Sequence, residues 1–211
     1  MLAQFRNSLP LGRRSGALVA PDTGFTLIEL LLTVAILAII TAVAAPSMGT
    51  MISNNRIQGA SSDLYADLAL ARGTAAAKGQ RVTVCQSSDG ATCTASSLWQ
   101  QGWIVFVDGN ANGTFEPATD TIVKVHAAVN TNLTVAPYSA AGTPPALTSS
   151  NTALTSVRYR PSGPTTNTAA TGFRVCQRGY AYRDIVINSM GKVTSSTITA
   201  TITTQSTTAC S

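Results

Sequence analysis

Residues 24–30 read GFTLIEL and open an apolar run that continues to residue 45. Nearly every residue of this run is Leu, Ile, Val, Ala or Phe, and its single charged residue is Glu29. At about 1.5 Å per residue, a helix over residues 25–45 would measure roughly 30 Å, the thickness of the hydrocarbon core of a bilayer. A carboxylate in such a segment is costly in lipid and therefore indicates a function or a partner.

The segment before the run is basic, with Arg6, Arg13 and Arg14. Positive charge on this flank keeps it in the cytoplasm and directs the rest of the chain across the membrane. A secretory signal would also have a basic start and an apolar core, and Ala42-Val43-Ala44 has the small residues of a cleavage site. However, neither a secretory signal nor a plain single-span anchor explains a glutamate inside the apolar run.

Gly, Phe and Glu at this spacing, followed by an uninterrupted apolar run, resemble the processing site of type IV prepilins and type II secretion pseudopilins. In that family a membrane-embedded peptidase cuts after the glycine and N-methylates the new terminal phenylalanine. The resemblance implies that residues 1–24 are a cleaved leader, that cleavage follows Gly24 and that Phe25 is methylated. It also implies that Glu29 pairs with the amino terminus of a neighbouring subunit during assembly, and that Pro46 kinks the helix.

Beyond residue 46 the composition indicates one exported globular domain. The chain has 211 residues, a formal net charge of +5 and four cysteines. This mild basicity does not by itself indicate a nucleic-acid partner, and an even cysteine count in an exported domain indicates disulfides. Of the three possible connectivities we favour Cys85–Cys93 with Cys176–Cys210. A zinc site is disfavoured because no C-x-x-C occurs and the single histidine, His126, is distant from the cysteines in sequence.

Hydrophobic periodicity divides the mature chain into a helical part and a β-rich part. Residues 47–79 repeat apolar residues every three to four positions and predict an amphipathic helix that ends near Gly79. The pattern then alternates, which predicts strands within residues 80–211, with 102–107 as a central strand and 139–151 as a long surface loop. The other predicted strands are 81–85, 121–125, 154–159, 172–176, 182–187, 191–194 and 197–203. The expected fold is α+β: a long kinked N-terminal helix (25–46 membrane or filament core, 47–79 amphipathic) packed on an antiparallel β-sandwich.

The second half also has a family resemblance. Residues 102–108 (GWIVFVD) with the Asn/Gly turn that follows, Cys176 with Arg178-Gly179, and a strand that ends in a Gly-Lys-Val turn resemble the GspH/FimT class. That class contains minor pilins of type IV pili and the minor pseudopilin of type II secretion. The paired cysteines favour the pilus side of the class.

Residues 108–116 (DGNANGTFE) have the opening pattern of a calcium loop, with oxygen-bearing side chains at Asp108, Asn110 and Asn112. The twelfth position is Thr119, where such a loop needs a glutamate. Asn, Asp and Gly are also the residues of a tight turn between strands. We therefore favour a turn over a metal site.

The later strands could also carry a surface that binds DNA. The basic residues of the later strands are Arg158, Arg160, Arg174, Arg178, Arg183 and Lys192, with tyrosines nearby in sequence, and such sets can bind phosphates and stack on bases. FimT-type pilins of transformable bacteria bind DNA through a C-terminal Gly-Arg-x-Arg motif. The matching turn here is Gly191-Lys192-Val193-Thr194, in which lysine and threonine replace the arginines. The candidate DNA-binding residues are Arg174, Arg178, Arg183 and Lys192; the alternative is a set of scattered, solvated charges.

No pattern for catalysis occurs: the sequence has no triad or nucleophile elbow, no phosphate-binding glycine loop, and a single histidine that we interpret as structural. The sequence therefore indicates a non-enzyme without a cofactor. We expect a minor type IV pilin that starts in the bacterial inner membrane with its C-terminal domain in the periplasm and is assembled into a surface pilus. The expected partners are other pilins, the prepilin peptidase and the inner membrane. The alternatives are a double-stranded DNA receptor for natural transformation and a type II secretion pseudopilin.

Overall fold

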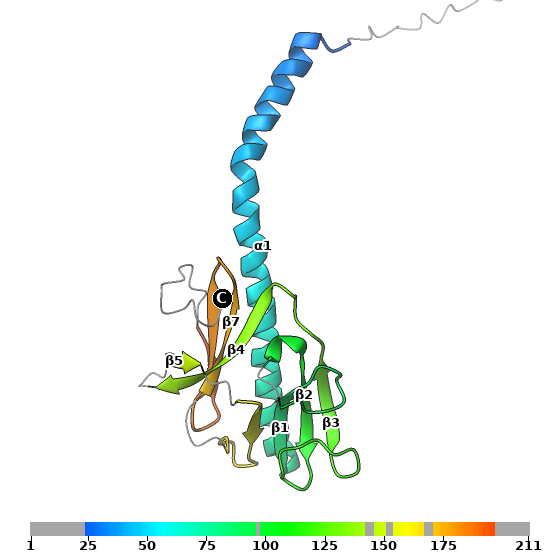
Figure 1. The fold of residues 1–211 in the computed structure, drawn as a ribbon, viewed down its shortest axis with the longest axis vertical. Coiled ribbons are helices and arrows are strands. Elements are labelled where there is room, and N and C mark those ends of the chain that lie inside the picture. Colours follow the sequence, from blue (N-terminus) through cyan, green and yellow to red (C-terminus); the bar gives the residue numbers. More distant parts are fainter. Residues whose placement is uncertain (1–23, 96–97, 142–145, 151–153, 167–170, 197–211) are drawn as a thin grey trace, which may run out of the picture. The chain divides into compact units, whose positions relative to one another are not determined.

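The computed structural model describes residues 24–95, 98–141, 146–150, 154–166 and 171–196. Residues 1–23 of the leader, the whole of the last predicted strand (197–203) and Cys210 lie outside these residues. The chain forms two compact units, Met1–Ala44 and Ala45–Ser211, which we describe separately. Helix α1, Leu27–Lys78, contributes residues to both units (Figure 1).

The first unit is the N-terminal part of α1. The Thr33 hydroxyl donates to the carbonyl of Leu30, and the Thr41 hydroxyl donates to the carbonyls of Leu37 and Ala38. Both hydroxyls are thus satisfied by the helix backbone. In the part of the chain that the structure describes, no helix combines the length and the apolar character needed to cross a membrane.

In the second unit, α1 is amphipathic, in agreement with the predicted period. Its buried side chains recur every three or four residues: Ile57, Ala60, Leu64, Leu68, Ala71 and Ala75. The helix ends at Lys78, and Gly79 follows with a φ of +65°. Glycine adopts this left-handed conformation at little cost, which explains the stop at this position.

The strands form two antiparallel sheets. The first has the order β3-β2-β1-β6, and a 3-10 turn, η1 (Trp99–Gln101), precedes β2. Its strands are β1 (Arg81–Gln86), β2 (Trp103–Asp108), β3 (Thr121–His126) and β6 (Ser156–Tyr159). Strand β2 is interior and entirely buried, as predicted for the apolar stretch 102–107.

The second sheet has the order β5-β4-β7-β8-β9. Its strands are β4 (Leu133–Ala141), β5 (Ala146–Ser150), β7 (Thr171–Gln177), β8 (Tyr182–Ile187) and β9 (Val193–Ser195). Strands β8 and β9 form the predicted late hairpin, in which Ile187 pairs with Val193.

One predicted element was wrong. The sequence predicted a surface loop over residues 139–151, whereas the structure places the end of β4 and all of β5 there. Ala, Gly and Pro are depleted in strands, and residues 139–151 show no regular apolar alternation, so no strand was predicted there. These residues form strands because residues 133–139 of β4 pair with β7, and β5 then pairs with the end of β4.

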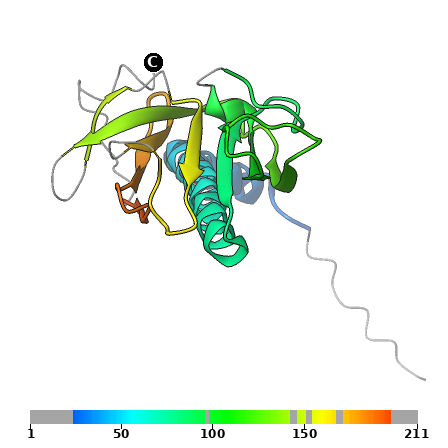
Figure 2. The ribbon, with the colours of Figure 1, turned by 90° about the horizontal axis from the view of Figure 1, so that it is seen from below.

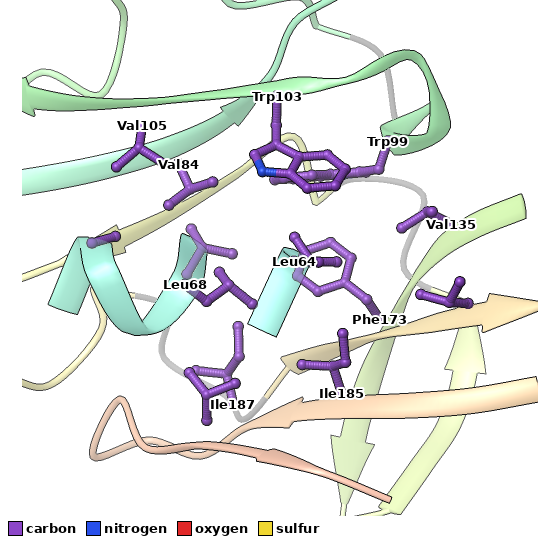
Figure 3. Packing of buried hydrophobic residues seen from close by; sticks show 14 of the residues in the cluster. Leu64, Leu68, Val84, Trp99, Trp103, Val105, Val135, Phe173, Ile185 and Ile187 are labelled. Atoms are coloured by element: carbon purple, nitrogen blue, oxygen red, sulfur yellow. The ribbon is translucent and has the colours of Figure 1, made fainter. Parts of the chain in front are cut away.

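One core joins the helix to both sheets. Leu64 and Leu68 of α1 lie between Val84, Trp103 and Val105 of the first sheet and Phe173, Ile185 and Ile187 of the second (Figure 3). Strands of both sheets lie around the helix when it is viewed near its axis (Figure 2). Each fully buried large side chain contributes about 1.5–3 kcal/mol. The expected α+β fold, a long helix packed on antiparallel sheets, is confirmed.

Candidate functional site

The start of α1 is organised by Thr26. Its hydroxyl oxygen accepts a hydrogen bond from the backbone N–H of Glu29 at 3.3 Å, and its carbonyl accepts from the N–H of Leu30 at 3.1 Å. Thr26 is therefore the N-cap, and Glu29 occupies the third helical position, where a carboxylate also interacts favourably with the helix dipole. Gly24 and Phe25 lie just before this turn and are exposed. The residues of the predicted processing motif are thus accessible.

The first unit exposes an apolar surface around the helix. Phe25 is 83% and Leu27 77% exposed. The other exposed large apolar side chains of this segment are Ile28, Leu30, Leu31, Leu32, Val34, Ile36, Leu37, Ile39 and Ile40. A contiguous apolar surface of this size is a site of association with protein or membrane. Pro46 lies farther along, within the bounds of α1.

The predicted disulfide Cys85–Cys93 is present, which confirms the small closed loop. With Ile104, Phe106 and Phe115 it forms a second apolar cluster on the outer face of β1 and β2. Cys176 is also disulfide-bonded. Its predicted partner, Cys210, lies outside the described residues, so the Cys176–Cys210 pairing stays a prediction.

Asp89 organises the loop that this disulfide closes. Its carboxylate accepts hydrogen bonds from the Thr92 hydroxyl, the backbone N–H groups of Ala91 and Thr92, and the Ser87 hydroxyl. These bonds, that from the Thr92 hydroxyl most of all, hold the pKa of the Asp89 carboxyl well below its ordinary value.

The segment that resembles a calcium loop connects β2 to β3 and uses its side-chain oxygens internally. Asp108 Oδ2 accepts from the Thr83 hydroxyl and from the N–H of Gly113. Asn110 and Asn112 each accept from a backbone N–H two residues ahead, and both amides donate to the Glu116 carboxylate. Local bonds of this kind are typical of turns.

The positively charged side chain of Arg158 contacts this loop. The Arg158 guanidinium donates to the Ala111 carbonyl at 2.6 Å and lies 3.8 Å from Asp108 Oδ2. Among the described residues, no group of three or more His, Cys, Asp or Glu side chains is arranged to hold a metal ion.

Arg174, a candidate for DNA binding, is buried and paired. Its Nε and Nη2 donate to the two carboxylate oxygens of Asp184, each at 2.7 Å. The guanidinium carbon lies 4.2 Å from the ring centre of Tyr182 and 5.1 Å from that of Tyr138. The bonds to Asp184 raise the pKa of Arg174 above its ordinary value. The side chain, 10% exposed, is thus held by the outer face of the second sheet.

The structure does not bring the remaining candidates together. Arg178 lies in the turn before β8 and Lys192 in the turn after it, and both are exposed. Because a strand rises about 3.3 Å per residue, the length of β8 separates these turns by roughly 20 Å. Arg183 lies within β8, and its guanidinium donates to the side-chain oxygen of Gln58 and to the carbonyl of Ser196.

His126 packs flat on Trp103, with ring centres 3.9 Å apart and an angle of 9° between the planes. Its Nδ1 lies 2.8 Å from the Ala127 carbonyl and its Nε2 lies 3.6 Å from Asp63. The neighbouring Trp103 N–H donates to Asp67, which also accepts from Lys124. Sequence reasoning missed this helix–sheet cluster because its residues are far apart along the chain.

The fold and the N-terminal motif together define a pilin-like protein. The sequence matches the prokaryotic N-terminal methylation motif over residues 21–45 and the family described as type II transport protein GspH over residues 60–191. The chain belongs to this GspH family. It is a structural protein of the pilin and pseudopilin type and not an enzyme.

A solved structure has a similar fold. A crystal structure of the type IV minor pilin FimU of Pseudomonas aeruginosa is 18% identical, with a TM-score of 0.51, and the match covers 68% of this chain and 90% of that one. A second crystal form of FimU gives a TM-score of 0.49 and covers 66% and 92%. The minor pseudopilin EpsH of the type 2 secretion system of Vibrio cholerae is 14% identical, with a TM-score of 0.42, and covers 69% and 97%. The comparison with curated proteins gives no significant match.

Proposed function

We propose that this protein is a minor type IV pilin: it is processed after Gly24, N-methylated at Phe25, and joins other pilins during assembly of the pilus. The observation that carries this proposal is the exposed apolar surface of the first unit, which begins at Phe25 and contains a single charge, Glu29. Among the described residues of its own unit this surface has no partner, in a chain whose family is pilin-like.

The same apolar helix serves two environments in succession. Before assembly it lies in the bacterial inner membrane, where the prepilin peptidase cleaves and methylates it. During assembly it transfers to the apolar centre of the filament and packs against the corresponding helices of other subunits. Apolar contacts stabilise the helix in both environments. They do not favour one axial position of a subunit over another, because the hydrophobic effect is non-directional.

Glu29 fixes the axial position of one subunit relative to its neighbour. Cleavage creates a cationic amino group at Phe25, and the carboxylate lies one helical turn away from that end. A carboxylate in an apolar environment needs a cationic partner, and a buried charge left unpaired costs about 3–5 kcal/mol. The amino terminus of a neighbouring subunit is that partner, so a subunit in the wrong register leaves two charges unpaired.

The globular domain is exposed to the periplasm and then to the cell surface. Its Cys85–Cys93 disulfide suits an oxidising compartment. We propose that this domain contacts other minor and major pilins in a complex that primes or caps the fibre.

Processing is tested by mass spectrometry of the chain purified from cells with and without the prepilin peptidase. The proposal predicts a mature chain that starts at Phe25 and carries an added methyl group, and an uncleaved chain when the peptidase is absent. Cleavage after Ala44 in both strains would show a secretory signal and would refute the proposal.

Assembly is tested with Glu29→Gln. Because the Glu29 backbone N–H bonds to Thr26 whatever the side chain, and glutamine also suits a capping box, this variant keeps the helix start. We expect normal processing and loss of the protein from sheared pili. Incorporation equal to that of the unaltered chain would refute the pairing role of Glu29.

A pseudopilin and a minor pilin predict different phenotypes when the gene is deleted. Deletion of the gene would impair protein secretion and leave piliation intact, whereas a minor pilin would show the reverse. We do not propose a DNA receptor as a second function, because Arg174 is paired with Asp184 and the other candidates are spread along β8. Duplex DNA binding that weakens steeply with salt and is lost on replacement of Arg178, Arg183 and Lys192 by Ala would reverse this assignment.

A further inference from the structure

A pocket of about 530 Å³ opens in the second unit between α1 and two turns of the β-domain. One wall is a face of α1 with Tyr65, Ala69, Arg72, Gly73 and Ala76. The other walls are the turn after β6 (161–163) and the start of β9 with Lys192 and Val193. The residues that line the pocket all belong to the second unit.

Two cations mark the pocket, and no carboxylate lines it. Neither Arg72 nor Lys192 forms a salt bridge with any residue that the structure describes. Arg72 makes one long hydrogen bond, 3.4 Å to the Met190 carbonyl, so most of its guanidinium donors are available. Its charge thus lies at the wall of the pocket without a counter-ion among the described residues.

Glycine positions keep the turns close to each other and to Arg72. A Cβ at Gly163 would lie 3.4 Å from the Arg72 guanidinium, and a Cβ at Gly191 would lie 2.2 Å from the Gly163 carbonyl. Both glycines have positive φ, which other residues rarely adopt. The two turns therefore pack against each other and bring Lys192 to the same pocket as Arg72.

The helix wall between the cations is apolar and shallow. Ala69, Gly73 and Ala76 lie at spacings of four and three, which places them on one face of the helix. The half-exposed ring of Tyr65 and the Val193 side chain border this face. Small residues allow the backbone of a bound chain to approach closely, and the cations at the rim favour a negative group beside it.

We propose that this pocket binds an acidic peptide segment of a partner protein, with its carboxylates at Arg72 and Lys192 and a small apolar side chain on Ala69, Gly73 and Ala76. Charge complementarity supports this occupant, because the pocket has two cations and no acid. A duplex is disfavoured because it presents rows of phosphates to a broad basic surface, whereas this site is concave and has two charges.

The test uses the full-length chain in a non-ionic detergent and a fluorescent peptide, acetyl-Ala-Asp-Ala-Glu-Ala. We expect saturable binding that weakens about tenfold for Arg72→Gln and for Lys192→Gln, because each removes a charge-assisted hydrogen bond. The peptide with Asn and Gln in place of its acids should bind equally weakly to all variants. Arg178→Gln, which removes an exposed charge outside the pocket, should bind as the unaltered chain does.

Gly73→Leu tests the pocket without changing its charge. A Cβ at Gly73 meets no atom within 4 Å, and leucine is a better helix former than glycine, so the variant should fold. Its side chain would fill the pocket and abolish peptide binding. If Arg72→Gln does not fold because it loses the hydrogen bond to Met190, Gly73→Leu and Lys192→Gln still test the proposal.

Three results would overturn the proposal. These are no saturable binding of the acidic peptide, an equal loss of affinity in Arg178→Gln, or unchanged binding by Gly73→Leu. A short DNA duplex that binds through Arg72 and Lys192 more tightly than the peptide would assign the pocket to nucleic acid instead. The measurements require neither cleavage at Gly24 nor assembly, so they succeed or fail independently of the proposed function.

Discussion

The indole N–H of Trp103 on β2 donates to Oδ2 of Asp67 on α1 at 2.9 Å. The other carboxylate oxygen of Asp67 accepts from the ammonium of Lys124 on β3. Asp67 is 1% exposed, so its charge is removed from water and depends on these two partners. This cluster ties the helix to the first sheet at one specific position, which non-directional apolar contacts alone would not select.

Asp67→Ala should lower the free energy of unfolding by about 3 kcal/mol, because it leaves the buried Trp103 N–H without an acceptor. Lys124→Gln should cost less, about 1–2 kcal/mol, because the glutamine amide can donate to Asp67 in place of the ammonium and the bond from Trp103 to the carboxylate is kept. Urea unfolding followed by tryptophan fluorescence measures both. Equal losses in the two variants would contradict a role for the Trp103 bond.

Arg174→Ala should be strongly destabilising, by about 3 kcal/mol, since it leaves the Asp184 carboxylate without its bidentate partner. Arg174→Lys should restore only part of this loss, because an ammonium cannot reproduce the planar fork or its contacts with Tyr138 and Tyr182. Arg178→Ala, an exposed control, should change stability by less than about 0.5 kcal/mol. Thermal unfolding by circular dichroism distinguishes these outcomes, and a silent Arg174→Ala would show that the ion pair contributes nothing.

Tyr159→Phe should leave stability unchanged or raise it by up to about 1 kcal/mol, because the buried Tyr159 hydroxyl has no hydrogen-bond partner in the structure. Burial also raises the pKa of Tyr159 above its ordinary value of 10.0. The free energy of unfolding should therefore fall as the pH rises above about 10, because the unfolded chain releases this proton more readily than the folded chain does.

Alkaline titration of tyrosinate absorbance checks this second part. The last ionisation of the native chain should disappear in Tyr159→Phe and persist in Tyr65→Phe, whose ring is 40% exposed. A marked loss of stability in Tyr159→Phe would reveal a partner for the hydroxyl.

Asp89 should remain ionised in acid at a pH where ordinary carboxyl groups are protonated. Since its pKa is lowered in the folded chain, its contribution to stability is present above the unfolded value of 3.8 and is lost as the pH falls below it. Amide hydrogen exchange at Ala91 and Thr92 should be faster in Asp89→Ala than in the unaltered chain. Carboxyl titration by NMR measures the pKa directly, and an ordinary value would contradict the hydrogen-bond assignment.

Features that depend on residues close together in the chain could be predicted from the sequence. The amphipathic period of α1, its stop at Gly79, the interior strand β2 and the β8–β9 hairpin follow from local spacing and turn chemistry. The Cys85–Cys93 disulfide joins residues eight apart, a short loop that closes easily. The methylation motif is also local, because a peptidase reads contiguous residues.

Features set by strand register and long-range packing were decided by the tertiary structure. From the sequence, Arg174 was a candidate for an unpaired cation that binds DNA. In the fold it is a buried partner of Asp184, because β7 and β8 pair these two residues directly. Strands β4 and β5 have little apolar alternation and form because β4 pairs with β7 and β5 pairs with β4. The pocket joins Arg72 to Lys192, 120 residues apart, through two glycine turns. Local pattern therefore determines most of the elements, whereas β4, β5 and the contacts among side chains depend on strand pairing and on how the elements bury a common core.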